Sequence, residues 1–305
     1  MVEPKILVQA PARLHLGLVK SSVDGGFIAA GLSLASPRME VAVQLAPMEA
    51  KPQRSKAERS AASIIARLGH KRAVVVETIK ELPAHHGFGS GTRMALAAAS
   101  GALKLVGEQM EILKITKLTG RGVRSAMGAV LFGQGGVAVD LEGDILRSAA
   151  PAAWRVALIL PRGDGEAHGF HGPHESLRID SAAPCSATMR SKLAQAGVEG
   201  LMAGAAYGDF EIFQRAVALF QAQAARQFGP MQGGSASSPQ GRKTLAWLKK
   251  EGIKACGQSS WGPALFALTP TPDEAKALLE KLKEMPHISW ARVVKIDNRG
   301  ARIKD

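Results

Sequence analysis

The chain has 305 residues, 46% of them hydrophobic, and a formal net charge of +13. This length allows one large or two medium domains with their own cores, and the composition is that of a globular protein. Only 5% of the residues are aromatic, which leaves few platforms for stacking bases, so the positive charge favours a small polyanionic ligand over nucleic acid. Excess lysine that serves solubility alone remains the alternative.

Hydrophobic periodicity and turn residues predict the elements along the chain. In the first half we expect strands at 6–10 and 39–45, a helix at 55–68, a strand at 73–77, a helix at 94–106 and a strand at 137–141. In the second half we expect a strand at 155–160, helices at 189–203 and 210–228, a loop at 229–241, a helix at 242–251, a strand at 264–268, a helix at 272–285 and a strand at 289–296. This order predicts two α+β units, residues 1–150 and 151–305.

The sequence also bears on cellular location. Its longest apolar stretch, residues 94–107, is interrupted by Lys104 and is too short to span a bilayer, and no signal segment is evident at the start. Cys185 and Cys256 lie far apart with no C-x-x-C pattern, so we expect reduced thiols and no disulfide framework. These features predict a cytoplasmic protein with no membrane partner.

The most informative segment is L-P-A-H-H-G-F-G-S-G-T-R at residues 82–93, directly before an alanine-rich helical run. Glycines, a serine and a threonine ahead of a helix place unpaired backbone N–H groups and the positive end of the helix dipole at one point, where phosphate binds. An ordinary helix cap would account for Ser90 and Thr92 but not for three glycines. The predicted phosphate-binding residues are Gly87, Gly89, Ser90, Gly91 and Thr92.

The form P-x-x-x-G-x-G-S, between a strand and a long helix, resembles the phosphate loop of the GHMP kinase superfamily. Further segments narrow the resemblance to the β-ribofuranosylaminobenzene 5′-phosphate synthase family. They are A-R-L-H-L-G-L at 12–18, D-G-G at 24–26, G-R-G-V-R-S at 120–125, F-G-P-M-Q-G-G at 228–234 and G-Q-S-S-W-G-P at 257–263.

The resemblance implies an α+β, GHMP-kinase-like two-domain fold, with a ribosomal-S5-like N-terminal domain, a ferredoxin-like C-terminal domain and the active site in the cleft between them. It also implies a transferase of tetrahydromethanopterin biosynthesis. Such an enzyme joins 4-aminobenzoate to 5-phosphoribosyl 1-diphosphate through a carbon–carbon bond and releases carbon dioxide and diphosphate. The oligomeric state stays open, a homodimer being one option.

Two departures from the kinase pattern favour the transferase. Kinases of the superfamily commonly carry an acidic residue shortly after a serine in the segment that here reads R-S-A-M-G, and the equivalent position is Gly128. The late glycine-rich motif is also altered at residues 258–261. An ATP-dependent small-molecule kinase of the same superfamily is the second hypothesis, and a non-enzymatic nucleic-acid or anion-binding protein is the third.

The resemblance and the chemistry together suggest roles for several residues. Arginine offers a planar fork to phosphate oxygens, so Arg121 and Arg124, with Ser125, are candidate catalytic residues, although a solvated loop is the alternative. His15, in the R-x-H string, is a candidate acid/base or carboxylate-binding group, or else a buried core histidine. The predicted substrate-binding residues are Arg13, Gln232, Gly233, Gln258, Ser259, Ser260 and Trp261.

Mg²⁺ is the expected partner of a diphosphate, bound through few carboxylates. Asp24 and Glu166 are the candidate ligands, although Asp24 is equally suited to a turn with Gly25. Histidines recur every third residue at 168, 171 and 174, but glycines and a proline interrupt any helix there. This interruption disfavours a zinc site.

Overall fold

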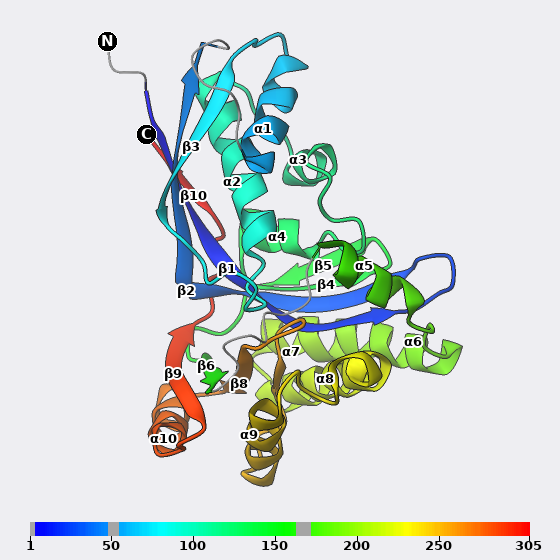
Figure 1. Cartoon of the computed structure of the whole chain (residues 1–305). Coiled ribbons are helices and arrows are strands. Elements are labelled where there is room, and N and C mark those ends of the chain that lie inside the picture. The colour runs from blue at the N-terminus through cyan, green and yellow to red at the C-terminus, as the bar shows by residue number, and fades with distance from the viewer. Residues whose placement is uncertain (1–3, 48–54, 163–171) are drawn as a thin grey trace.

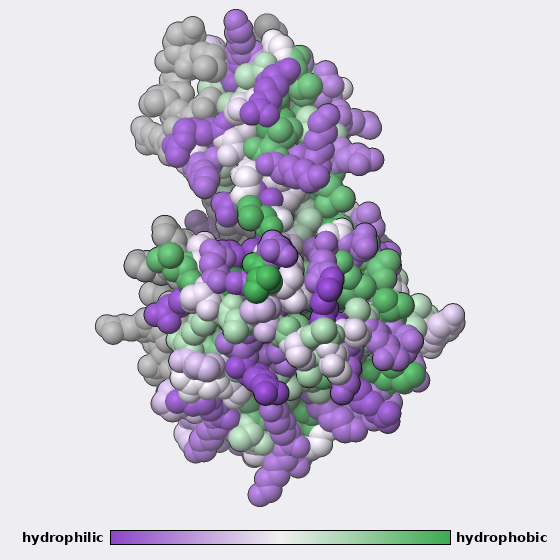
Figure 2. Space-filling view, turned by 90° about the vertical axis from the view of Figure 1, so that its right-hand side faces the viewer, coloured by the Kyte–Doolittle hydropathy of each residue, from purple (hydrophilic) through white to green (hydrophobic). Residues whose placement is uncertain are grey.

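The computed structural model of the chain describes residues 4–47, 55–162 and 172–305. It contains two β-sheets with helices packed on each (Figure 1). From the side, the surface is indented between a smaller upper part and a larger lower part, and hydrophilic and hydrophobic side chains alternate over both (Figure 2). Among the described helices, none combines the length and apolar character that crossing a membrane requires.

The first sheet is built on two long antiparallel strands, β1 (Ile6–Lys20) and β2 (Phe27–Ala46). Their register shifts after Pro11 and again after His15, and such bulges bend a strand pair. The strand order is β10-β1-β2-β4-β5, and β3 also pairs with β2. The remaining strands are β3 (Ala73–Lys80), β4 (Val137–Leu141), β5 (Asp144–Ser148) and β10 (Arg302–Lys304).

Helices cover one face of the upper part of this sheet (Figure 1). They are α1 (Lys56–Ala66), α2 (Ser90–Leu105), α3 (Ile112–Leu118) and α4 (Met127–Gln134). The alanine-rich face of α2 lets this helix lie close to the strands: a Cβ at Gly101 would be 2.6 Å from the Val43 side chain. This packing fixes the N-terminus of α2 at the middle of the molecule.

The second sheet has the antiparallel order β7-β8-β6-β9, flanked by two helices. Its strands are β6 (Arg155–Pro161), β7 (Cys256–Gln258), β8 (Leu265–Thr269) and β9 (Ile288–Lys295), and its helices are α9 (Pro239–Lys250) and α10 (Pro272–Lys283). Both helices begin with proline in the first turn, where the missing N–H costs nothing, after a Ser238 or Thr271 cap.

A helical layer lies below the lower half of β1 and β2 (Figure 1). It consists of α6 (Ala187–Gln195), the π-helical turn η1 (Ala196–Met202), α7 (Ala203–Tyr207) and α8 (Phe210–Gln232), while α5 (Gly172–Ser181) lies on the other side of the strands. The long helix α8 packs on both β1 and β7. It therefore joins the two sheets beside the candidate site.

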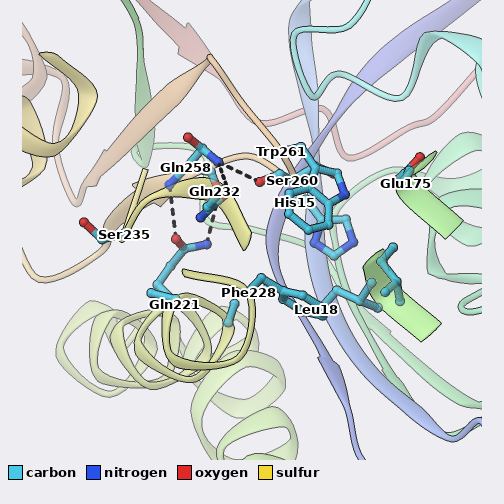
Figure 3. Close-up of a pocket in the computed structure, with 14 residues that line it drawn as sticks. His15, Leu18, Glu175, Gln221, Phe228, Gln232, Ser235, Gln258, Ser260 and Trp261 are labelled. Carbon is cyan, nitrogen blue, oxygen red and sulfur yellow. Dashed lines mark hydrogen bonds between the residues drawn. The ribbon is translucent and has the colours of Figure 1, made fainter. Parts of the chain in front are cut away.

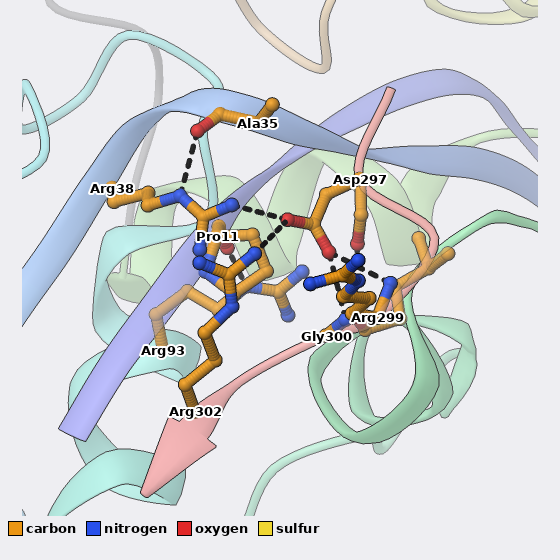
Figure 4. A network of polar contacts seen from close by, with 10 residues as sticks. Pro11, Ala35, Arg38, Arg93, Asp297, Arg299, Gly300 and Arg302 are labelled. Atoms are coloured by element: carbon orange, nitrogen blue, oxygen red, sulfur yellow. Dashed lines mark hydrogen bonds and ion pairs between the residues drawn. The ribbon is translucent and has the colours of Figure 1, made fainter. Parts of the chain in front are cut away.

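The C-terminal tail returns to the first sheet and is held there by Asp297 (Figure 4). This carboxylate is buried, pairs with Arg38, and accepts the backbone N–H groups of Arg299 and Gly300, each at 2.8 Å. A strand after residue 300 was not expected from the sequence. Residues 302–304 thus join the sheet of the first unit, although they belong to the range 151–305.

The expected strand at 137–141 is confirmed with the bounds of β4, and most other expected elements are confirmed with shifted bounds. The main correction concerns residues 229–241, expected as one loop, because α8 continues to Gln232 in spite of Pro230 and α9 begins at Pro239. The expected helix at 189–203 is divided into α6, η1 and α7. Strands β1 and β2 extend well beyond their predicted ends, since both strands are apolar on two faces where helices cover them.

Candidate active site

Two adjoining pockets lie where the first sheet meets α8 and the loop after β7. The first, which we call the apolar pocket, has walls formed by Leu18, Ile179, Phe228 and Trp261 (Figure 3). Trp261 and Phe228 meet edge to face, with ring centroids 5.5 Å apart. An apolar lining with two aromatic rings suits a small planar ligand.

The second, which we call the cationic pocket, spans about 1290 Å³ when the open solvent at its mouth is included. It is lined by four arginines, Arg13, Arg93, Arg121 and Arg124. Glu175 is the one carboxylate among the described residues that line either pocket. The two pockets share His15, Leu18, Glu175, Ile179 and Ser260, so a ligand bound at the junction contacts both.

The glycine loop supplies the N-terminus of α2 to this region. Gly89 is the N-cap residue in the left-handed conformation (φ 74°), and no described side chain caps the first turn. The Arg13 guanidinium lies against Gly89, and the Arg121 guanidinium is 3.7 Å from where a Cβ at Gly91 would stand. Amides at a helix N-terminus flanked by two guanidiniums are a candidate anion site.

Gly87 makes a close contact that the sequence did not predict. A Cβ at this position would be 2.1 Å from the main-chain oxygen of Ser259, so Gly87 permits close contact between the glycine loop and the loop after β7. Ser259 is fully buried and donates its hydroxyl to the Gly87 oxygen at 2.8 Å. It also accepts the backbone N–H of His15 at 3.0 Å. Ser259 therefore connects the glycine loop, β1 and the loop after β7 through hydrogen bonds, and it lines neither pocket.

Arg93, in the first turn of α2, is a site residue that the sequence analysis missed. It is 1% exposed and donates from Nε to the Pro11 oxygen and from Nη1 to the Gly128 oxygen. Its Nη2 has no hydrogen-bond partner among the described residues. A guanidinium directly after a glycine loop and within an apolar helical run was the signal that could have found it.

The pKa values of the two most buried arginines, Arg93 and Arg13, are both lowered. Burial and the neighbouring Arg13 lower the pKa of Arg93 from 12.5 to about 9. Burial also lowers the pKa of Arg13 to about 10, and the opposing influence is the nearby carboxylate of Glu175. Both guanidiniums remain charged at neutral pH. The cationic pocket therefore holds buried positive charge that a polyanionic ligand would neutralise.

The segment 119–125 carries the other two arginines. Arg121 has a buried Nε with no partner among the described residues, while Arg124 pairs with Asp180 of α5 at 3.3 Å. Ser125 donates its hydroxyl to Asp140 at 2.8 Å, and Asp140 also accepts the Ala126 N–H. Ser125 lines the cationic pocket, and its observed bond anchors the arginine segment to β4.

His15 lies on β1 at the junction of the pockets and is 8% exposed. Burial, and secondarily the charge of Arg13, hold the pKa of His15 well below its ordinary value of 6.5. The imidazole is therefore neutral at neutral pH. A neutral ring donates one hydrogen bond and accepts another, which suits it to orient a ligand at the junction.

The C-terminal half supplies the polar end of the apolar pocket (Figure 3). Gln232, Gln258 and Ser260 line it, as predicted, and Ser260 has a positive φ of 56° that turns the loop between the pockets. Trp261 is 7% exposed, and it both packs in the core and forms a pocket wall. Gly233 is the exposed C-cap of α8, with φ 84°, and lines neither pocket.

Comparison with known families agrees with this architecture. Residues 55–136 match the GHMP kinases N terminal domain, and residues 189–288 match the GHMP kinases C terminal domain. The chain belongs to the GHMP kinase family. The family confirms the expected two-domain α+β fold.

Two relatives carry the name "Beta-ribofuranosylphenol 5'-phosphate synthase". The protein of Archaeoglobus fulgidus is 24% identical, covering 97% of this chain and 99% of the relative. That of Methanothermobacter thermautotrophicus is 23% identical, covering 87% of this chain and 89% of the relative. Among solved structures, mevalonate pyrophosphate decarboxylase from Streptococcus pyogenes has a TM-score of 0.72 at 15% identity over 98% of both chains. Homoserine kinase from Cytophaga hutchinsonii has a TM-score of 0.64 at 16% identity, covering 99% of this chain and 98% of that one.

Of the two candidate metal ligands, the structure describes only Asp24. Asp24 lies exposed in the turn between β1 and β2, beside Gly25 (φ 89°), and lines neither pocket. Glu166 lies outside the described residues, as do His168 and His171, and the side chain of His174 is not described. Within the described residues, no three His, Cys, Asp or Glu side chains gather as a metal site.

Proposed function

We propose that this protein is a decarboxylating phosphoribosyl C-transferase, a β-ribofuranosylaminobenzene 5′-phosphate synthase of tetrahydromethanopterin biosynthesis. It would join 4-aminobenzoate to 5-phosphoribosyl 1-diphosphate. The observation that carries the proposal is the junction of the two pockets: a cavity walled by aromatic side chains opens at His15 into one lined by four arginines. An aromatic acid and a polyanionic sugar phosphate are the two substrate classes that match these linings.

The relatives' name supports transfer of a phosphoribosyl group to an aromatic ring, and it raises the question of which aromatic acid is the acceptor. A ribofuranosylphenol carries a hydroxyl on the ring where a ribofuranosylaminobenzene carries an amine. Either group, placed opposite the carboxylate, donates electrons to the ring carbon that attacks the sugar. We propose 4-aminobenzoate as the acceptor of this chain, with 4-hydroxybenzoate as the other acceptor to be tested.

The first chemical step breaks the bond between the sugar C1 and the diphosphate oxygen, and the electron pair leaves with the diphosphate. Negative charge grows on that oxygen in the transition state, and donors already in place stabilise it most. The amides at the start of α2, with Arg13 and Arg121 beside them, provide such donors. Arg93 adds a buried positive charge to the same cavity.

A divalent cation, Mg²⁺ in this proposal, would neutralise further charge on the diphosphate. Glu175 is the candidate protein ligand, because it is the one described carboxylate that lines the pockets and it lies close enough to Arg13 to affect its pKa. Most ligands of the ion would then be substrate oxygens. Turnover should cease in excess chelator and return with added Mg²⁺, and full activity in chelator would contradict a metal requirement.

In the second step the ring carbon that bears the carboxylate forms a bond to C1. The bond between that carbon and the carboxylate then breaks, its electrons restore the aromatic ring, and carbon dioxide leaves. No proton is gained or lost in this exchange, so the step needs no general base. The neutral His15 and the absence of an acidic side chain at Gly128 are compatible with this requirement.

The same two residues argue against the kinase hypothesis. A kinase of this type benefits from a carboxylate that accepts the proton of the acceptor hydroxyl. Here the main-chain oxygen of Gly128 is instead bound to Arg93, a cation. A neutral imidazole and a guanidinium at these positions suit an anionic acceptor better than an alcohol.

The direct test is product analysis. The purified protein is incubated with phosphoribosyl diphosphate, Mg²⁺ and either benzoate, and the C-riboside 5′-phosphate is identified by mass. Parallel reactions contain ATP with homoserine or mevalonate. The proposal predicts the C-riboside and no phosphorylated alcohol, whereas ATP-dependent phosphorylation without the C-riboside would favour the kinase.

A further inference from the structure

The end of the apolar pocket away from the arginines is polar. Gln221, Gln232, Gln258 and Ser235 line this end, opposite the side where His15 and Glu175 open toward the cationic pocket (Figure 3). None of these four residues lines the cationic pocket. The cavity therefore has an apolar middle between a cationic mouth and a polar inner end.

Two of the glutamine amides are oriented by fixed partners. Gln221 donates from Nε2 to the oxygens of Leu16 and Gln258 and accepts the backbone N–H of Gln258 at 3.1 Å. Gln258 donates from Nε2 to the Ser260 oxygen and to Oε1 of Gln232, both at 3.0 Å, and accepts the Ser237 N–H. Both N–H donors of each amide are thus engaged within the protein.

Gln232 and Ser235 keep hydrogen-bonding capacity. Gln232 Oε1 accepts from Gln258, and its Nε2 donates to the Gly234 oxygen at 3.0 Å. This amide retains one N–H donor and one oxygen lone pair, in an orientation that Gln258 fixes. The half-buried hydroxyl of Ser235 forms no hydrogen bond with any described residue. One pocket end therefore presents both donors and acceptors.

A benzoate bound for the proposed reaction can lie in only one direction. Its carboxylated carbon must reach the sugar, so it lies at the junction beside His15 and Ser260, and the ring then lies against the wall that Phe228 and Trp261 form. The group opposite the carboxylate then points to the polar end. We propose that Gln232 and Ser235 bind this para substituent and select acceptors that carry a hydroxyl or amino group there.

This inference rests on the proposed function and specifies which para-substituted benzoates the protein accepts. A para-hydroxyl or para-amino group satisfies the spare donor and acceptor of Gln232 and the hydroxyl of Ser235. A hydrogen or methyl at that position would leave the polar groups of Gln232 and Ser235 unpaired and shielded from water. This penalty for unpaired polar groups discriminates against such acids more strongly than the gain of a hydrogen bond favours the others. One neutral hydrogen bond at such a site corresponds to about fivefold in affinity.

The experiment measures binding, so that it is independent of turnover. Calorimetric titrations use 4-aminobenzoate, 4-hydroxybenzoate, benzoate and 4-methylbenzoate, with ribose 5-phosphate and inorganic diphosphate present as unreactive occupants of the cationic pocket. The variants are Ser235→Ala and Gln232→Met. Ser237→Ala is the matched control, because its buried hydroxyl lies two residues away, has no described partner and does not line the pocket.

We expect the unmodified protein to bind the para-amino and para-hydroxyl acids at least fivefold more tightly than the other two, with each site variant losing this preference and Ser237→Ala keeping it. Ser235→Ala is the cleaner variant, since Gln232→Met also removes a partner of Gln258. Equal binding of all four acids would overturn the inference and leave the proposed function standing. Binding of none would overturn the inference, and the product assay would then judge the function separately.

Discussion

Arg93 donates a hydrogen bond from Nη1 to the main-chain oxygen of Gly128, 2.5 Å away, inside the cationic pocket. The cation thus lies at the position where kinases of this family commonly carry an acid. This contact joins the first turn of α2 to the start of α4 and leaves Nη2 without a partner among the described residues.

Replacing Arg93 should weaken the use of phosphoribosyl diphosphate. We expect Arg93→Met to lower kcat/KM for this substrate by about 30-fold, corresponding to about 2 kcal/mol for a hydrogen bond to a charged oxygen, with a smaller effect on the benzoate. Arg147→Met is the control, since Arg147 also donates to main-chain oxygens but lies outside both pockets. Equal kinetic losses in both variants would mean that Arg93 acts only on stability.

Gly128 offers a matched pair of substitutions. A Cβ there would stand 4.0 Å from Nη1 of Arg93, so Gly128→Ala should fold and react nearly normally. Gly128→Asp would place a carboxylate beside Arg93 and neutralise it, and the KM for phosphoribosyl diphosphate should rise about tenfold. Steady-state kinetics on both variants, with melting temperatures compared, tests this; a normal KM in the aspartate variant would remove Arg93 from the proposed site.

The glycines of the loop should respond differently to alanine. Gly89→Ala places a side chain at φ 74°, against Arg13, and should cost about 1–2 kcal/mol in the free energy of unfolding. Gly91→Ala meets only ordinary contact with Arg121, so stability should hold or rise slightly. If phosphate binds the amides there, the KM for phosphoribosyl diphosphate should still increase. An unchanged KM in the stable Gly91→Ala protein would show that phosphate binds elsewhere.

The depressed pKa of His15 predicts a pH dependence of stability. Below pH 6.5 the unfolded chain takes up a proton at His15 that the folded chain, with its lowered pKa, does not, so stability falls as the pH falls. Relative to a His15→Gln variant, the protein should lose about 1.4 kcal/mol of unfolding free energy per pH unit between pH 6 and pH 5. Urea unfolding of both proteins across this range measures the difference, and parallel pH profiles would show that folding does not lower the pKa of His15.

Much of the fold and part of the site could be predicted from local sequence. The glycine loop and Arg121 depend on short-range rules, the conformation of glycine and the dipole of the following helix, and they meet at α2 as expected. Gly87 and Ser259 could not be understood this way, because their role is a contact between segments 172 residues apart. Arg93 escaped notice because its significance comes from burial and an unpaired Nη2, which only the packing reveals.

Pattern alone also misjudged the polar loop around Gln232. Glycine, serine and proline at 229–241 predicted an irregular connection, but packing of α8 against β1 and β7 extends the helix through Pro230. As a result Gln232 is held on a rigid helix end and its amide is oriented by Gln258. Tertiary packing outweighed local propensity at the residue most directly involved in the proposed selectivity.

The coupling of carbon dioxide release to diphosphate release tests the central claim most directly. The protein is mixed with phosphoribosyl diphosphate and carboxyl-labelled 4-aminobenzoate or 4-hydroxybenzoate, and labelled carbon dioxide, diphosphate and C-riboside are quantified over time. Our account predicts that the three appear in equal amounts with at least one of the acids. Diphosphate without labelled carbon dioxide, or no product from either acid in a folded protein with Mg²⁺, would contradict it.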